Sequence, residues 1–129
     1  MHEEYVEVSA DTWHLVQEIK KQGHQVWSLG TTTTRSLESA ALGLLTGSEQ
    51  TGFSGFSKLL IQPGYDFKVV DVLLTNFHQP QSTLLALVSA FSSLEKVKAC
   101  YSWAIERKFR LFSYGDLSVW TSRTSAPPK

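Results

Sequence analysis

The stretch HQVWSLGTTTTRSLESAALGLL, residues 24–45, decides the fold class that the sequence predicts. Its first part is a short apolar segment, typical of a strand, that ends at Gly30. The segment that follows, from Thr31, has the spacing of apolar residues that predicts a helix. A strand that is followed directly by a tight turn and a helix often forms part of a ligand-binding site in α/β proteins. We therefore expect an α/β fold.

The N-terminal segments extend this pattern. A strand is expected over Tyr5–Val8, and residues 9–23 carry the signals of a helix. Ser9 or Asp11 can cap its start, and Gly23 can take the left-handed position after its end. The predicted apolar stripe of this helix comprises Trp13, Leu15, Val16 and Ile19.

The central part of the chain is expected to be mostly extended. Residues 46–57 are rich in glycine and serine and predict a flexible connection. A strand over residues 58–62 leads to a turn at Pro63 and Gly64. Residues 67–77 predict one long strand or a bent pair of strands.

The C-terminal part predicts two helices and a last strand. Residues 82–93 are apolar almost all round and should form a buried helix that starts at Ser82 or Thr83. Residues 94–108 have the pattern of an amphipathic helix. Residues 109–116 alternate at period two, as a strand does.

Length and charge limit the number of domains in this chain and the kinds of partner that it can bind. Its 129 residues suit one domain, which we place over residues 1–120 with a parallel or mixed sheet flanked by helices; residues 121–129 form a polar, disordered tail. Twelve basic residues balance twelve acidic ones, which argues against a surface that binds polyanions everywhere. Any contact with nucleic acid must therefore be local, or shared with something outside this chain.

The cysteine count and the hydropathy pattern indicate the cellular compartment that we expect for this chain. Cys100 is the single cysteine, which excludes an internal disulfide framework and a cysteine-based zinc site. There is no run of 18 apolar residues, and the N-terminus lacks the apolar core of a signal peptide. We expect a cytoplasmic protein with no membrane contact and no metal.

The first candidate site segment runs from Gly30 to Arg35. A glycine turn, four hydroxyl groups and free backbone N–H groups at a helix N-terminus suit an anion or a polar nucleoside. Arg35 can hold a phosphate or a carboxylate. The alternative is structural: the hydroxyls cap the helix, and Arg35 pairs with Glu38 or faces solvent.

The second candidate segment runs from Thr75 to Thr83. It places Asn76, His78 and Ser82 in a loop after a strand, where α/β sheets usually bind ligands. His78 can accept or donate a proton near neutral pH. A structural role for this histidine remains the alternative. No second histidine or carboxylate lies at metal-ligand spacing from it.

The third candidate segment, Phe112 to Asp116, carries Tyr114 and a carboxylate next to a glycine turn. Asp116 can hold a cationic or hydroxylated ligand, or it can simply stabilise the turn. Asp71 lies inside an apolar stretch, so it is expected to be buried and to need hydrogen bonds or a charged partner. It is either a structural anchor or a site residue.

Taken together, these segments resemble a known family. In chain order, MHEEYVEV, GTTTTRSLESAA, PGYDFKVVDVLLTNFHQPQSTLLALVSAF and FRLFSYGD are similar to the C-terminal part of the S-adenosylmethionine:tRNA ribosyltransferase-isomerases of queuosine biosynthesis. The resemblance extends from Met1 to about Trp120. It implies an α/β domain that the family combines with a β-barrel domain, with the site between them. The barrel and the earlier α/β elements are not in this chain.

The resemblance also implies a reaction. Enzymes of this family transfer the ribosyl moiety of S-adenosylmethionine, which is a substrate, to 7-aminomethyl-7-deazaguanine at the wobble position of tRNA. The moiety rearranges to give epoxyqueuosine, and adenine and methionine are released. The implied partners are tRNA and the missing N-terminal part with its β-barrel. The alternative is a non-catalytic fragment or a nucleoside-binding module that is inactive without that part.

Roles for individual residues follow from the resemblance as expectations. His78 would transfer a proton, Asn76 would orient a substrate group, and Asp116 would act at the catalytic centre. Asp116 with Tyr114 would hold the sulfonium or the ribose. Thr32, Thr33 and Arg35 would bind the methionine carboxylate or a tRNA phosphate. The remaining candidates for substrate binding are Glu38, Asp71, Ser82 and Thr83.

Overall fold

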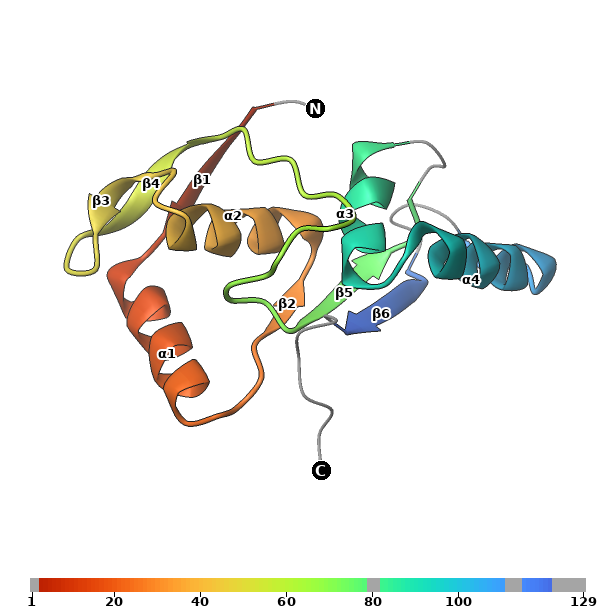
Figure 1. Ribbon diagram of the computed structural model, residues 1–129, viewed down its shortest axis with the longest axis horizontal. Coiled ribbons are helices and arrows are strands. Elements are labelled where there is room, and N and C mark those ends of the chain that lie inside the picture. The colour runs from red at the N-terminus through yellow and green to blue at the C-terminus, as the bar shows by residue number, and fades with distance from the viewer. Residues whose placement is uncertain (1–2, 79–81, 111–114, 122–129) are drawn as a thin grey trace.

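Six strands and four helices lie in the residues that the computed structural model describes, 3–78, 82–110 and 115–121 (Figure 1). Their order along the chain confirms the α/β prediction. The elements are β1 (Glu4–Val8), α1 (Ala10–Lys21), β2 (Trp27–Leu29), α2 (Thr31–Ala41), β3 (Thr46–Ser48), β4 (Gly52–Ser57), β5 (Val72–Asn76), α3 (Thr83–Phe91), α4 (Leu94–Glu106) and β6 (Leu117–Thr121).

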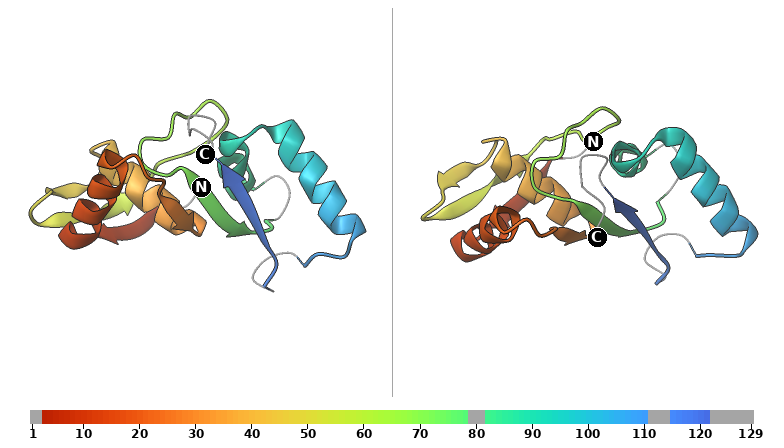
Figure 2. Two further views of the ribbon diagram at one scale, coloured as in Figure 1. Left: turned by 90° about the horizontal axis from the view of Figure 1, so that it is seen from below. Right: turned by 60° about the horizontal axis from the view of Figure 1, so that its bottom comes forward.

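The strands form two three-stranded sheets. In sheet A the order is β1-β4-β3 and both pairs are antiparallel; in sheet B the order is β2-β5-β6, with β2 parallel and β6 antiparallel to β5. Sheet B is the mixed sheet that the sequence predicts. Figure 2 shows β5 and β6 side by side, with α4 extending away from them.

Sheet A corrects one expectation. The flexible connection predicted over residues 46–57 is wrong, because this segment forms the β3–β4 hairpin. Gly52 has a φ of +83°, and a Cβ atom there would lie 2.7 Å from the carbonyl oxygen of Val8. The glycine therefore lets β4 approach β1 closely, so a composition that resembles a linker serves strand pairing instead.

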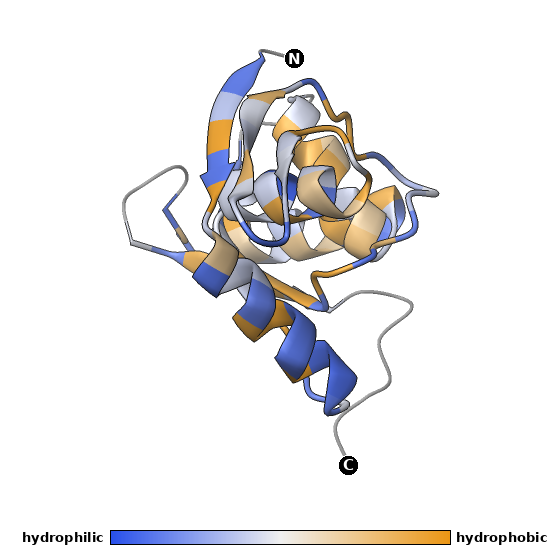
Figure 3. Ribbon diagram, turned by 90° about the vertical axis from the view of Figure 1, so that its left-hand side faces the viewer, coloured by the Kyte–Doolittle hydropathy of each residue, from blue (hydrophilic) through white to orange (hydrophobic). Residues whose placement is uncertain are grey.

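Other expectations hold in part. Ser9 caps α1 and Ser82 caps α3, each accepting a hydrogen bond from the backbone N–H three residues on. Leu15 does not belong to the buried stripe of α1, since 62% of it is exposed. Figure 3 shows hydrophobic and hydrophilic residues alternating along α1, as in an amphipathic helix.

Of the strands predicted on either side of Pro63, the one over residues 58–62 is wrong and the one over residues 67–77 is confirmed only in its second half. Residues 58–71 contain no strand, and only Val72–Asn76 joins the sheet. The turn is confirmed, because the N–H of Tyr65 donates to the carbonyl of Gln62 at 3.0 Å. The predicted last strand over 109–116 is absent from its described residues, and β6 begins at Leu117 instead. Apart from Thr121, the expected polar tail lies outside the described residues.

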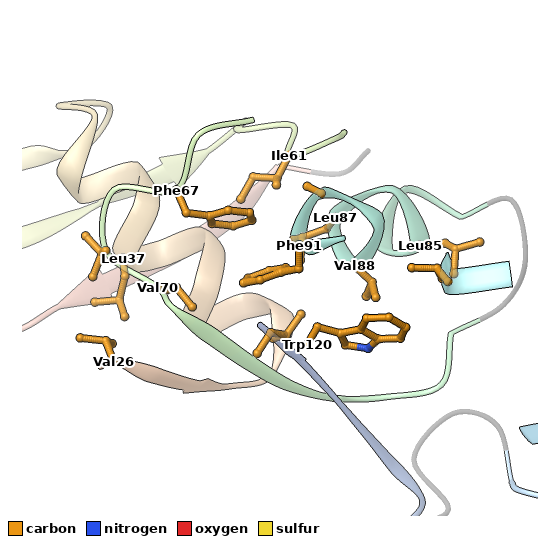
Figure 4. Packing of buried hydrophobic residues seen from close by; sticks show 14 of the residues in the cluster. Val26, Leu37, Ile61, Phe67, Val70, Leu85, Leu87, Val88, Phe91 and Trp120 are labelled. Carbon is orange, nitrogen blue, oxygen red and sulfur yellow. The ribbon is translucent and has the colours of Figure 1, made fainter. Parts of the chain in front are cut away.

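The hydrophobic core lies on one face of sheet B. Residues of α2, α3 and the 59–70 segment pack there, with Trp120 of β6 beneath α3 (Figure 4). Its largest side chains that are less than 2% exposed are Phe91, Ile61, Leu73 and Leu87. This packing confirms that α3 is a buried helix.

A buried carboxylate joins α2 to the segment that precedes β5. Glu38 is fully buried, and its oxygens accept hydrogen bonds from the Tyr65 hydroxyl and from the backbone N–H groups of Lys68, Val69 and Val70, at 2.7–2.9 Å. Burial, together with the Glu38 carboxylate, raises the pKa of Tyr65 far above its usual range, so the phenol stays a donor. A buried charge needs such partners.

Glu38→Ala should destabilise the chain by about 3 kcal/mol or more, because it leaves buried N–H donors without an acceptor. Glu38→Gln should cost less, since the amide keeps one acceptor oxygen. Urea unfolding followed by circular dichroism measures both. Glu18→Ala, at an exposed position on α1, is the matched control and should change stability by less than about 0.5 kcal/mol. Equal stability of Glu38→Ala and the control would contradict this role.

Candidate functional site

The carboxyl edge of sheet B brings the three candidate segments together. Because β2 and β5 are parallel, the turn at Gly30 and the loop after Asn76 lie at the same edge, and the N–H of Gly30 donates to Leu74 at 2.8 Å. The antiparallel strand β6 starts there too, since Leu117 pairs with Asn76. The side chain of Asn76 donates to the backbone carbonyl of Asp116 at 3.3 Å.

His78 is held in a half-buried position just beyond β5. Its ring Nε2 lies 2.8 Å from the hydroxyl of Thr75, and its backbone N–H donates to the hydroxyl of Tyr101 at 2.9 Å. Tyr101 is buried and its ring packs edge-on against Phe77, which positions that hydroxyl. Burial lowers the pKa of His78 below its usual value of 6.5, so the imidazole is neutral at neutral pH and can accept a proton.

Asp116 is held by Arg110. The backbone N–H of Arg110 donates to the carboxylate, and its side-chain Nε and Nη2 lie 3.3 and 3.4 Å from the two oxygens. These hydrogen bonds lower the pKa of Asp116, so it stays ionised at neutral pH. The arrangement puts an anion and a neutral base on neighbouring parts of one edge.

The N-terminus of α2 has no side-chain cap. Gly30 precedes it with a φ of +91°, a conformation that favours glycine. Thr32 donates to the carboxylate of Glu4 at 2.9 Å, and Thr33 is exposed. Both threonines line a cleft of about 310 Å³ between β1 and α2, whose lining also includes hydroxyls of Ser9 and Thr12. Hydroxyl-bearing residues of α2, Thr32, Thr33 and Ser36, therefore line this cleft.

Arg35 is turned inward. It is 5% exposed, and each of its three guanidinium nitrogens donates within the chain: to the carboxylate of Glu4 at 3.1 Å and to the backbone carbonyls of Ser57 and Leu59 at 3.1 and 3.2 Å. The structural alternative named Glu38 or solvent as its partner, but the partner is Glu4. These contacts fasten α2 to sheet A.

Two carboxylate candidates lie away from the carboxyl edge. Glu38 is inside the fold, as described above. Asp71 lies before the other end of β5, where it accepts hydrogen bonds from Lys20 at 3.0 Å and from the backbone N–H of Val26 at 2.8 Å. Of the two roles that the sequence left open for Asp71, these contacts support the structural anchor.

Comparison with known proteins assigns the chain to a family. The family model described as queuosine biosynthesis protein matches residues 1–119. The chain belongs to this family. A curated relative from Halothermothrix orenii, named S-adenosylmethionine:tRNA ribosyltransferase-isomerase, is 48% identical over 116 residues, which are 90% of this chain and 33% of the relative. The crystal structure of S-adenosylmethionine tRNA ribosyltransferase from Thermotoga maritima matches with a TM-score of 0.80 and 40% identity, over 92% of this chain and 40% of that one.

The resemblance found in the sequence is thereby confirmed. The chain spans about a third of the curated relative and two-fifths of the solved chain. It is an α/β unit that corresponds to the C-terminal part of the larger fold.

Two of the remaining candidate residues lie at the start of α3. Ser82 accepts a hydrogen bond from the N–H of Leu85 at 3.1 Å as the N-cap of α3, and Thr83 is exposed in the first turn. Tyr114 lies outside the described residues. No group of three or more metal-ligating side chains and no helix able to cross a membrane occurs among the residues that the structure describes.

Sequence reasoning did not single out three residues that contact His78 or Asp116, namely Thr75, Tyr101 and Arg110. Thr75 is three residues from His78, and a hydroxyl at that spacing at the end of a strand was a usable signal. Tyr101 had none, because it reaches His78 from a helix that is distant in sequence. Arg110 lies only six residues before Asp116, but no pattern marked it as the partner of that carboxylate.

The lowered pKa of His78 predicts a pH dependence of stability. Between the folded-state pKa and 6.5 the unfolded chain binds more protons than the folded one. The contribution of His78 is therefore fully present above pH 6.5 and is lost as pH falls through the folded-state pKa. The imidazole signals of His78 in an NMR titration should have a midpoint below 6.5, and His78→Gln should flatten this part of the pH–stability curve. A midpoint at or above 6.5 would contradict the effect of burial.

Proposed function

We propose that this chain is the C-terminal α/β portion of an S-adenosylmethionine:tRNA ribosyltransferase-isomerase and acts together with the portion that its relatives carry in addition. The family membership and the 48% identity to a relative of that name support this activity. The substrates would be S-adenosylmethionine and tRNA that carries 7-aminomethyl-7-deazaguanine, and the product would be epoxyqueuosine in tRNA. An enzyme with this substrate would work in the cytoplasm.

The observation that carries the proposed site is the meeting of Asn76, His78 and Asp116 at the carboxyl edge of sheet B. The reaction needs a base for a proton beside the sulfonium, which that positive charge acidifies, and a donor for the departing adenine. His78 is neutral and half-buried, which suits proton transfer. Asn76 would orient a substrate group, and the ionised Asp116, together with Tyr114, would hold the sulfonium or the ribose.

The N-terminus of α2 is proposed as the anion-binding part of the site. Its N–H groups and the hydroxyl of Thr33 would bind the methionine carboxylate or a tRNA phosphate. Thr32 would join them by exchanging its hydrogen bond to Glu4 for one to the bound anion. Arg35 would contribute by holding this helix against sheet A, since its donors are engaged there. The substrate-binding roles expected of Glu38, Asp71, Ser82 and Thr83 would likewise be indirect, through the helices and loops that they fix.

His78→Ala should lower the rate of adenine release by about 100-fold or more, as loss of a general acid or base does. The assay uses this chain fused in place of the matching segment of the Halothermothrix orenii relative, with S-adenosylmethionine and the aminomethyl-deazaguanine tRNA. Affinity for tRNA should stay nearly unchanged. Leu15→Ala, at an exposed position on α1, is the matched control and should keep full activity.

Unchanged adenine release by the His78→Ala fusion would remove His78 from the mechanism. A fusion without His78 substitution that releases no adenine, although it is folded and binds tRNA, would contradict the proposed activity of this chain.

A second candidate function is a nucleoside-binding module without a tRNA role. The balance of twelve basic and twelve acidic residues favours it, because tRNA binding through phosphates needs positive charge. Filter binding of tRNA over a salt series separates the two functions. A steep loss of affinity with salt supports phosphate contacts, whereas undetectable tRNA binding by a folded fusion would favour the nucleoside-binding module.

A further inference from the structure

One face of sheet B is apolar and exposed. The register places Trp27, Leu29, Leu117 and Val119 on the same face, because Leu29, Leu74 and Val119 are aligned across the three strands and Trp27 and Leu117 lie two residues away along their strands. Each of the four is 46–69% exposed. The other face carries Ser28, Leu73 and Trp120, all buried in the core.

The exposed part of this face lies on its two outer strands, β2 and β6, since Val72 of the central strand, opposite Trp27, is 2% exposed. In Figure 1, α2 and α3 lie on one side of β2, β5 and β6, and Figure 4 shows the buried side chains of the core gathered on that same side. A three-stranded sheet with a packed face and an open apolar face is half of a layered α/β structure, since both faces of such sheets are normally covered. Exposed large apolar residues that lie together mark an interaction surface.

We propose that this face, made by Trp27, Leu29, Leu117 and Val119, docks the additional portion of the relatives' chain. The inference rests on the proposed function only in so far as that function gives this chain a complementary portion. About two-thirds of the length of the curated relative lies outside the match. A chain segment of that length is ample to cover a sheet face, and it would be present in the same molecule at high effective concentration.

The composition of the face defines the chemistry of the partner surface. Its four outward side chains are uncharged and large, and Asn76 at the carboxyl edge is the polar residue of β5 that points the same way. The covering surface should therefore be aliphatic or aromatic over β2 and β6, and polar beside Asn76. Because the face borders the carboxyl edge, docking there would also bring the additional portion next to His78 and Asp116.

The test measures the accessibility of one residue of the face in two proteins. Val119→Cys is introduced, in a Cys100→Ser background, into this chain alone and into the fusion with the remainder of the Halothermothrix orenii relative. Reaction with a maleimide reagent should be at least 10-fold slower in the fusion. Leu15→Cys, an equally exposed apolar position on α1, is the matched control and should react at similar rates in both proteins.

Each outcome decides the proposal. Equal labelling of Val119→Cys in both proteins would overturn it. Labelling in the chain alone that is slow and speeds up on dilution would also overturn it, because a second copy would then cover the face. If the fusion is insoluble, the same rates are read after co-expression of the remainder as a separate polypeptide. Protection of Val119→Cys without adenine release would support the docking face and contradict the proposed activity, so the two can fail separately.

Discussion

The other parts of this structure are held in place by the hydrogen bonds that the buried Glu38 carboxylate accepts. It is fully buried and collects four hydrogen bonds from the chain between Tyr65 and Val70. That segment has no strand or helix of its own, so its N–H groups need an acceptor from elsewhere. Because β5 begins directly after it, the contact with α2 sets where the central strand of sheet B starts.

Helix α2 joins sheet A to the segment that precedes β5 of sheet B through two charged residues one turn apart, Arg35 and Glu38. Glu38 holds the segment before β5, and Arg35 holds sheet A through Glu4 and two backbone carbonyls. Both side chains are buried, and both have partners that satisfy their charge or their donors. The N-terminus of α2 is thereby fixed at the carboxyl edge, where the N–H of Gly30 donates to the carbonyl of Leu74. The candidate site is thus a consequence of how α2 is anchored.

The edge combines groups of opposite character. His78 is kept neutral by burial, whereas Asp116 is kept ionised by Arg110. An enzyme that abstracts a proton next to a sulfonium would need both properties, a neutral base and a fixed negative charge. If the open apolar face beside this edge docks the additional portion, as proposed above, the site described in this chain is one wall of a larger one.

The sequence by itself determined the α/β class, the strand–turn–helix element around Gly30, the caps at Ser9 and Ser82, the buried character of α3 and the family. Each of these depends on local spacing or on a long motif. The tertiary structure alone decided that residues 46–57 form a hairpin, that residues 58–71 do not form a strand, and that Arg35 faces Glu4. It also decided that Tyr101 and Arg110 support His78 and Asp116. Several of these features depend on contacts between residues far apart in sequence, such as β4 with β1, Arg35 with Glu4 and Tyr101 with His78. The β3–β4 pairing and the Arg110–Asp116 pair are local, but periodicity carries no information about which partner a donor or a strand edge will meet.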